Sequence, residues 1–132
     1  MIAFLKGRLA GKTAATAFID VNGVGYAVGI SQASLSKLPE AGAPVEVHTY
    51  MQVRDDAVAL FGFMTVEEKA LFERLIGVGG VGPKVALAAL SVFTPQALVA
   101  AIAAQDVAAV SKIPGVGKKT ASRIILELKG SL

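Results

Sequence analysis

The feature that most constrains this chain is a short glycine–lysine segment that occurs twice. Gly80-Val81-Gly82-Pro83-Lys84 returns 35 residues later as Gly115-Val116-Gly117-Lys118-Lys119. Apolar positions on both sides repeat at the same spacing: Leu75 matches Val110, Val78 matches Ile113, Ala86 matches Ala121 and Leu90 matches Ile125. Each copy therefore predicts an apolar helix, a glycine turn with a lysine, and a second apolar helix.

A turn of this kind is suited to holding an anion. The start of a helix leaves amide N–H groups without partners and carries partial positive charge, and both effects stabilise an anion placed there. Glycines let the turn adopt a positive φ and let a phosphate approach closely. The candidate phosphate ligands are the glycines and lysines of the two turns: Gly80, Gly82, Lys84, Gly115, Gly117, Lys118 and Lys119. The alternative is that Gly-x-Gly merely joins two packed helices.

The charge distribution favours a nucleic-acid backbone as that anion. The 13 basic and 10 acidic residues balance over residues 1–64, where there are five of each, so the whole excess of +3 lies in residues 65–132. A weakly basic half with cations at its turns is typical of phosphate contacts. Such contacts read no bases, so we expect binding that is independent of sequence and sensitive to salt.

Residues 1–63 predict a small β-barrel. Five segments with alternating or apolar character read as strands: Ile2–Leu9, Ala14–Asp20, Val24–Ile30, Val45–Val53 and Val58–Phe63. Asn22-Gly23 indicates a tight hairpin, and Ser31–Leu38 reads as a short helix before Pro39. Five strands with a helix between the third and fourth indicate an OB-type barrel.

Residues 64–132 predict an all-helical domain, so the fold class is α+β with two domains and a boundary near 63/64. Thr65 and Glu68 have the spacing of a capping box. Thr94-Pro95 and Asp106 each predict a helix start, and the last helix is expected from about Lys118 to Lys129. The domain contains both glycine turns, each flanked by helices.

Several functions are disfavoured by the residues that the chain has. Gly77-Val78-Gly79-Gly80-Val81-Gly82 matches the dinucleotide pattern G-x-G-x-x-G, which suggests a nucleotide-dependent oxidoreductase. That pattern must follow a strand in a βαβ unit, whereas here it follows an amphipathic helix. The absence of cysteine excludes disulfides and thiolate metal sites, and His48 alone cannot build a zinc site. We expect a protein without a metal or cofactor. Without a signal peptide or an apolar run of about 18 residues, we expect a cytoplasmic protein without a membrane span.

The two halves together resemble the RuvA family of bacterial Holliday-junction proteins. The resemblance rests on both glycine segments, on Gly23-Val24-Gly25-Tyr26, on Val53-Arg54-Asp55-Asp56-Ala57 and on Leu60-Phe61-Gly62-Phe63, and it covers essentially the whole chain in order. It implies a protein that is not a catalyst, with paired helix-hairpin-helix motifs that hold DNA backbone, in recombination and repair and in the SOS response to DNA damage. A generic duplex-binding helix-hairpin-helix module is the alternative.

The resemblance also implies an assembly and partners. The family forms homotetramers, in one layer or two face-to-face, that hold a four-way junction open and flat for a RuvB-type hexameric ATPase, with a RuvC-type resolvase as a further partner. The family normally continues into a third helical domain that contacts the motor, and these 132 residues stop before it. Motor contact is therefore not expected from this segment, whereas junction binding is.

The resemblance gives roles to three further positions. Asp55 and Asp56 would form an acidic pin at the tetramer centre, and Arg54 beside them would hold a deflected strand. Without the resemblance, this pair reads as a solvated turn, or as half of a catalytic or Mg²⁺ site that lacks further acids. Arg123, one helical turn after Lys119, is expected on the DNA-binding face, with a solvated helix surface as the alternative.

Overall fold

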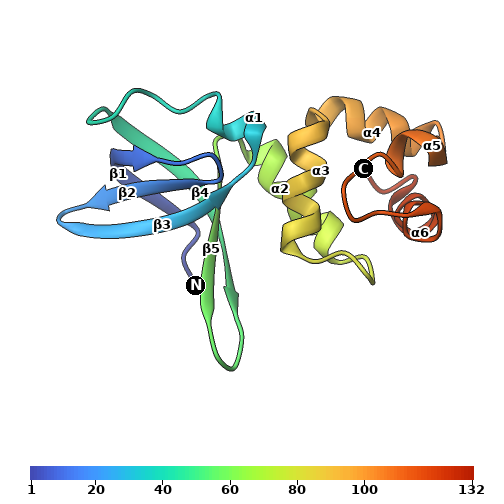
Figure 1. Ribbon diagram of the computed structural model, residues 1–132, viewed down its shortest axis with the longest axis horizontal. Coiled ribbons are helices and arrows are strands. Elements are labelled where there is room, and N and C mark those ends of the chain that lie inside the picture. Colours follow the sequence, from blue (N-terminus) through green and yellow to red (C-terminus); the bar gives the residue numbers. More distant parts are fainter. The chain divides into compact units, whose positions relative to one another are not determined.

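The computed structural model describes all of residues 1–132 and divides into two compact units, Met1–Lys69 and Ala70–Leu132. The first contains the strands and the second most of the helices (Figure 1). Helix α2 (Val66–Ile76) begins in the first unit and ends in the second. The predicted ranges, 1–63 and 64–132, place all of α2 in the second part and stay a prediction.

The first unit is a closed five-stranded barrel, as predicted. Its strands are β1 (Phe4–Lys12), β2 (Thr16–Val21), β3 (Val24–Ile30), β4 (Pro44–Val53) and β5 (Val58–Phe63). They close in the order β1-β2-β3-β5-β4, with β4 back beside β1, and only the β3–β5 pair is parallel. This order, with helix α1 (Gln32–Leu35) between β3 and β4, is that of the OB-type barrel.

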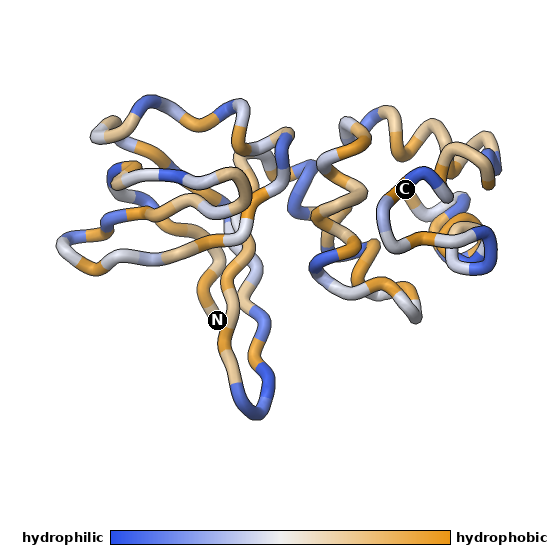
Figure 2. The backbone as a smooth tube through the Cα atoms, viewed as in Figure 1, coloured by the Kyte–Doolittle hydropathy of each residue, from blue (hydrophilic) through white to orange (hydrophobic).

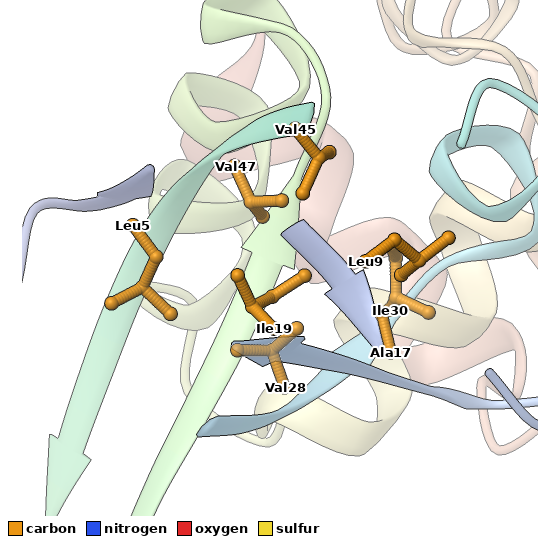
Figure 3. Packing of buried hydrophobic residues seen from close by; sticks show 8 residues of the cluster. All are labelled: Leu5, Leu9, Ala17, Ile19, Val28, Ile30, Val45 and Val47. Carbon is orange, nitrogen blue, oxygen red and sulfur yellow. The ribbon is translucent and has the colours of Figure 1, made fainter. Parts of the chain in front are cut away.

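Alternation along the strands builds the barrel core. Eight buried aliphatic residues from β1, β2, β3 and β4 converge inside it (Figure 3): Leu5, Leu9, Ala17, Ile19, Val28, Ile30, Val45 and Val47. Full burial of one such aliphatic side chain stabilises a fold by roughly 1.5–3 kcal/mol. The shared core fixes the strand register, because a slip of one residue would turn these side chains outward.

Several predicted bounds shift where local hydrogen bonds decide them. β1 runs on to Lys12 and β2 begins only at Thr16, because the Thr13 N–H donates to the Thr16 carbonyl at 2.8 Å across the turn. The expected helix over residues 31–38 is shorter, with Ser31 as its N-cap and Ser36 as its C-cap. The Asn22-Gly23 hairpin is confirmed, with both φ angles positive.

The second unit is helical, as predicted. It comprises the rest of α2 with α3 (Pro83–Val92), α4 (Pro95–Ala103), α5 (Val107–Val110) and α6 (Lys118–Leu128). Thr94 and Asp106 cap α4 and α5, as the sequence indicated. The repeated apolar positions form the core, because every matched pair from Leu75 and Val110 to Leu90 and Ile125 is buried.

No single helix has the length and apolar character required to cross a membrane. Helices α3 and α4 would meet that requirement only together, and they are bent by 98° at the break between them.

Glu68 departs from its predicted role. The Thr65 side chain does cap α2, because its Oγ1 accepts from the Glu68 N–H at 3.1 Å. The Glu68 carboxyl, however, is buried, and its Oε1 accepts hydrogen bonds from the hydroxyls of Ser31 and Ser34. The first half of the predicted capping box is therefore confirmed, while the carboxyl fastens α2 to α1 in the first unit.

We predict that Glu68→Ala lowers the free energy of unfolding by about 2–3 kcal/mol, because it leaves two buried hydroxyls without their acceptor. Glu68→Gln keeps an oxygen acceptor and should cost less. The exposed neighbour gives the control, since Glu67→Ala should stay within about 0.5 kcal/mol of the parent. Chemical denaturation followed by circular dichroism measures all three, and equal stability of the Glu68→Ala and Glu67→Ala variants would contradict this role.

Candidate nucleic-acid interface

The first glycine turn joins α2 to α3. Gly80 has a φ of +88°, and the next residue closes the turn, with the Val81 N–H donating to the Val78 carbonyl at 3.1 Å. Gly82 then takes an extended conformation, with φ −95° and ψ 177°, as the N-cap of α3. Pro83 occupies the first helical position, where no N–H is needed.

The second turn, between α5 and α6, reproduces the first almost angle for angle. Gly115 has a φ of +87°, and the Val116 N–H donates to the Ile113 carbonyl at 3.0 Å. Gly117 is the N-cap of α6, with φ −88° and ψ −178°. The repeat that the sequence predicts is therefore a repeat of backbone conformation.

The two glycines of each turn serve different purposes. Gly80 and Gly115 have the positive φ that side chains rarely tolerate. Gly82 and Gly117 have ordinary φ angles, and a Cβ added to either would meet no protein atom within 4 Å. The missing side chain at these two N-caps keeps the helix start open to solvent.

The starts of α3 and α6 are the only helix starts in the chain without a side-chain cap. Side chains of Ser31, Thr65, Thr94 and Asp106 accept from backbone N–H groups at the starts of α1, α2, α4 and α5. Gly82 and Gly117 offer no such acceptor. The first-turn N–H groups of α3 and α6 therefore remain available to an external acceptor, and the helix dipole favours an anionic one.

Each of these open helix starts has at least one lysine in its first turn. Lys84, Lys118 and Lys119 lie in the first turns of α3 and α6 and are exposed. None of them forms an ion pair, since the single ion pair of the chain joins Arg123 to Glu127. Their positive charge is therefore not neutralised by a neighbouring carboxylate, and it adds to the attraction for an anion.

Arg123 is placed differently from the three lysines. Its Nε donates to Glu127 Oε2 at 2.7 Å within α6, and its guanidinium lies against Gly79 of the first turn. The sequence pattern gave no sign of this contact between the two motifs. Arg123 is therefore a partly neutralised cation, and a direct phosphate contact by it stays a prediction.

The acidic pair lies at the end of the β4–β5 hairpin, which extends beyond the rest of the barrel (Figure 1). The Arg54 N–H donates to the Ala57 carbonyl at 2.8 Å and closes the loop around Asp55 and Asp56. All four residues are exposed, and the hairpin end is hydrophilic (Figure 2). No third Asp, Glu or His joins the pair to form a metal-binding group, so the structure gives the Mg²⁺ alternative no support.

The dinucleotide pattern over residues 77–82 lacks the context that nucleotide binding requires. It follows helix α2 rather than a strand. The one parallel strand pair, β3–β5, lies in the barrel and has no part in it. The oxidoreductase alternative therefore has no structural basis in this chain.

Two family models match the chain, one in each half. Residues 1–62 match the RuvA N terminal domain, and residues 72–129 match the SAM-like Helix-hairpin-helix tandem. The second match contains both glycine turns, so the expected tandem of helix-hairpin-helix motifs is confirmed.

Curated relatives from several bacteria match along the whole chain. Proteins of Acidobacterium capsulatum and Thermobifida fusca are each 52% identical over 132 residues, and one of Symbiobacterium thermophilum is 49% identical over the same length. Each is named Holliday junction branch migration complex subunit RuvA. The chain covers 67%, 65% and 64% of these proteins, so it spans about two thirds of the length of its relatives.

The division of labour between the glycines predicts opposite effects of the same substitution. Gly80→Ser forces a side chain into a left-handed conformation and should lower the free energy of unfolding by about 1–2 kcal/mol. Gly82→Ser introduces a favoured N-cap residue at an ordinary φ and should leave stability unchanged or slightly raised. Thermal unfolding of the two variants beside the parent measures the difference, and equal losses would contradict the assignment.

Proposed function

The chain belongs to the RuvA family, and from this premise we propose that it binds four-way DNA junctions by their phosphate backbones, independently of base sequence. The observation that carries the proposal is the pair of uncapped helix starts at Gly82 and Gly117. All other helices of the chain satisfy an N–H with one of their own side chains. These two leave first-turn N–H groups without a side-chain acceptor, in a repeated backbone conformation.

Two such sites suit a polymer of phosphates better than a single small anion. The open amides of the first turn and Lys84 receive one phosphate. The open amides of the second turn, with Lys118 and Lys119, receive another on the same DNA arm. Each neutralised phosphate releases counterions, so binding weakens steeply as salt rises. Backbone contacts fix position and orientation but do not read bases.

The hairpin end supplies selectivity that the turns lack. In a homotetramer, in one layer or two, each subunit contributes Asp55 and Asp56 at its exposed end to a cluster of carboxylates at the centre. Exposed charges act over about one Debye length, which is ~8 Å at physiological salt. The cluster therefore repels only phosphates that would lie at the centre of the tetramer. This repulsion disfavours a continuous duplex and favours a junction whose strands separate there. Arg54, beside the carboxylates, holds a parting strand.

Branch migration itself requires a partner. The relatives are named as subunits of a branch migration complex. We propose that this protein holds the junction open and flat while a RuvB-type hexameric ATPase moves the DNA, and that a RuvC-type resolvase acts on the same junction in recombination and repair. In this proposal, the residues of the chain bind the DNA backbone and select the junction, and they carry out no chemical step.

A generic duplex-binding module is the second candidate. It is favoured by one specific observation, since both open helix starts lie in the Ala70–Leu132 unit and do not require the barrel or its acidic hairpin. Such a module would bind any double-stranded DNA equally well. The two candidates therefore differ in whether Asp55 and Asp56 affect the choice of DNA.

We predict that Asp55→Asn combined with Asp56→Asn strengthens duplex binding relative to junction binding. The ratio of the two affinities should fall by roughly tenfold, which corresponds to about 1.4 kcal/mol of lost discrimination. Fluorescence anisotropy with a synthetic four-way junction and a duplex of one arm's sequence measures both.

The matched control removes the same charge elsewhere on the barrel. Glu40→Gln combined with Glu46→Gln changes two exposed carboxylates away from the hairpin end. This variant should bind the junction and the duplex more tightly by about the same factor. An unchanged junction preference in the Asp55/Asp56 variant would favour the generic duplex-binding module.

A further inference from the structure

Arg123 and Gly79 form a close contact between the two helix-hairpin-helix motifs. A Cβ placed on Gly79 would lie 2.5 Å from Arg123 Nη2, 2.7 Å from Cζ and 2.9 Å from Nη1. All three atoms lie within 3.0 Å of that position, so the guanidinium of Arg123 occupies the space that a Cβ on Gly79 would need. A residue larger than glycine would displace it.

Glu127 holds the guanidinium in this place. Its Oε2 accepts from Arg123 Nε at 2.7 Å, one helical turn further along α6. The side chains are 59% and 37% exposed, so the ion pair by itself adds little stability. Its effect is directional, because a bond to Nε orients the guanidinium plane and leaves both Nη groups over the first turn.

The contact links the two candidate phosphate sites. Gly79 directly precedes Gly80, whose positive φ shapes the first turn. Arg123 lies one helical turn after Lys119 of the second site. A second contact runs in the opposite direction, because a Cβ on Gly115 would lie 3.3 Å from Val85 Cγ2 of α3. Each turn thus packs against the second helix of the other motif.

We infer that Arg123 is a positioning residue, held by Glu127, which fixes the first turn against the second so that both anion sites meet one DNA backbone together. This inference rests on the proposed function. When two sites have a fixed spacing, binding of the first phosphate makes the second contact effectively intramolecular and raises the overall affinity. This gain in affinity is lost when the spacing of the sites no longer matches the spacing of the phosphates. Arg123 then contributes to affinity through geometry rather than through a phosphate contact of its own.

A direct phosphate ligand and a positioning residue respond differently to substitution. Arg123→Lys keeps the positive charge, so a direct phosphate contact would largely survive. Lysine has no planar guanidinium and no Nε–H to donate to Glu127, so a positioning role would be lost. Removal of a true phosphate contact would also reduce the slope of log affinity against log salt by about 0.9.

Gly79→Ala tests the contact without changing any charge. Gly79 does not have a positive φ, so alanine fits its backbone, and the new methyl group displaces the guanidinium. Gly77→Ala is the matched control, because it lies in the same turn, also lacks a positive φ, and its Cβ would meet its nearest neighbour at an ordinary 3.4 Å.

The experiment measures anisotropy of a labelled synthetic four-way junction over a salt series. The proteins are the parent, Gly79→Ala, Gly77→Ala, Arg123→Lys, Arg123→Gln and the double variant Gly79→Ala with Arg123→Gln. We expect Gly79→Ala and Arg123→Lys each to weaken binding about fivefold, which corresponds to about 1 kcal/mol, with an unchanged salt slope. Gly77→Ala should match the parent, and the double variant should bind no more weakly than Arg123→Gln alone, because both changes remove one contact.

Parental affinity in either Gly79→Ala or Arg123→Lys would overturn the inference, as would a salt slope about 0.9 lower in Arg123→Gln. Thermal unfolding of each variant separates these outcomes from loss of folding, since a positioning role requires weaker binding by a folded protein. The two proposals fail separately. If the parent itself binds no junction, the proposed function is wrong, whereas a parent that binds alongside an unaffected Gly79→Ala variant refutes only the role of Arg123.

Discussion

The function proposed for this protein depends on backbone N–H groups that its own side chains leave unsatisfied. The side chain of a serine, threonine or aspartate caps four of the six helices, while α3 and α6 have glycine as their N-cap residue. A serine at these two N-caps would satisfy one N–H in each helix and place a side chain where a ligand must approach. The glycines therefore forgo a local hydrogen bond and reserve both helix starts for an external anion.

The rest of the second unit maintains these two helix starts. Val81 and Val116 are buried directly beside the glycines that they separate, so each turn is anchored in the core while its glycines face solvent. Gly79 with Arg123, and Gly115 with Val85, then fix each turn against the other motif. In the first unit, the Glu68 carboxyl performs a similar fastening between α2 and α1. Polar contacts fix positions here, while apolar burial supplies most of the stability.

Periodicity and turn chemistry made much of this predictable from the sequence. The five strands, the helical half and the repeated turn follow from alternation, from helical spacing and from Gly-x-Gly. The roles of Glu68 and Arg123 did not follow. Glu68 has capping-box spacing, yet its partners Ser31 and Ser34 lie more than 30 residues earlier in the chain. Arg123 resembles any exposed helical arginine until folding brings Gly79 beside it. Such contacts depend on tertiary packing, which local patterns do not contain.

The most direct test of the account is the solution mass of the protein, measured by light scattering, with a synthetic four-way junction and with a linear duplex of equal length. If each subunit binds the backbone of one arm and four hairpin ends together select the junction, a discrete complex forms. One junction then carries four copies of the 13.5 kDa chain, or eight if two tetramers face each other. The duplex should be bound more weakly under the same salt. Single copies distributed in the same way on both DNAs would contradict it.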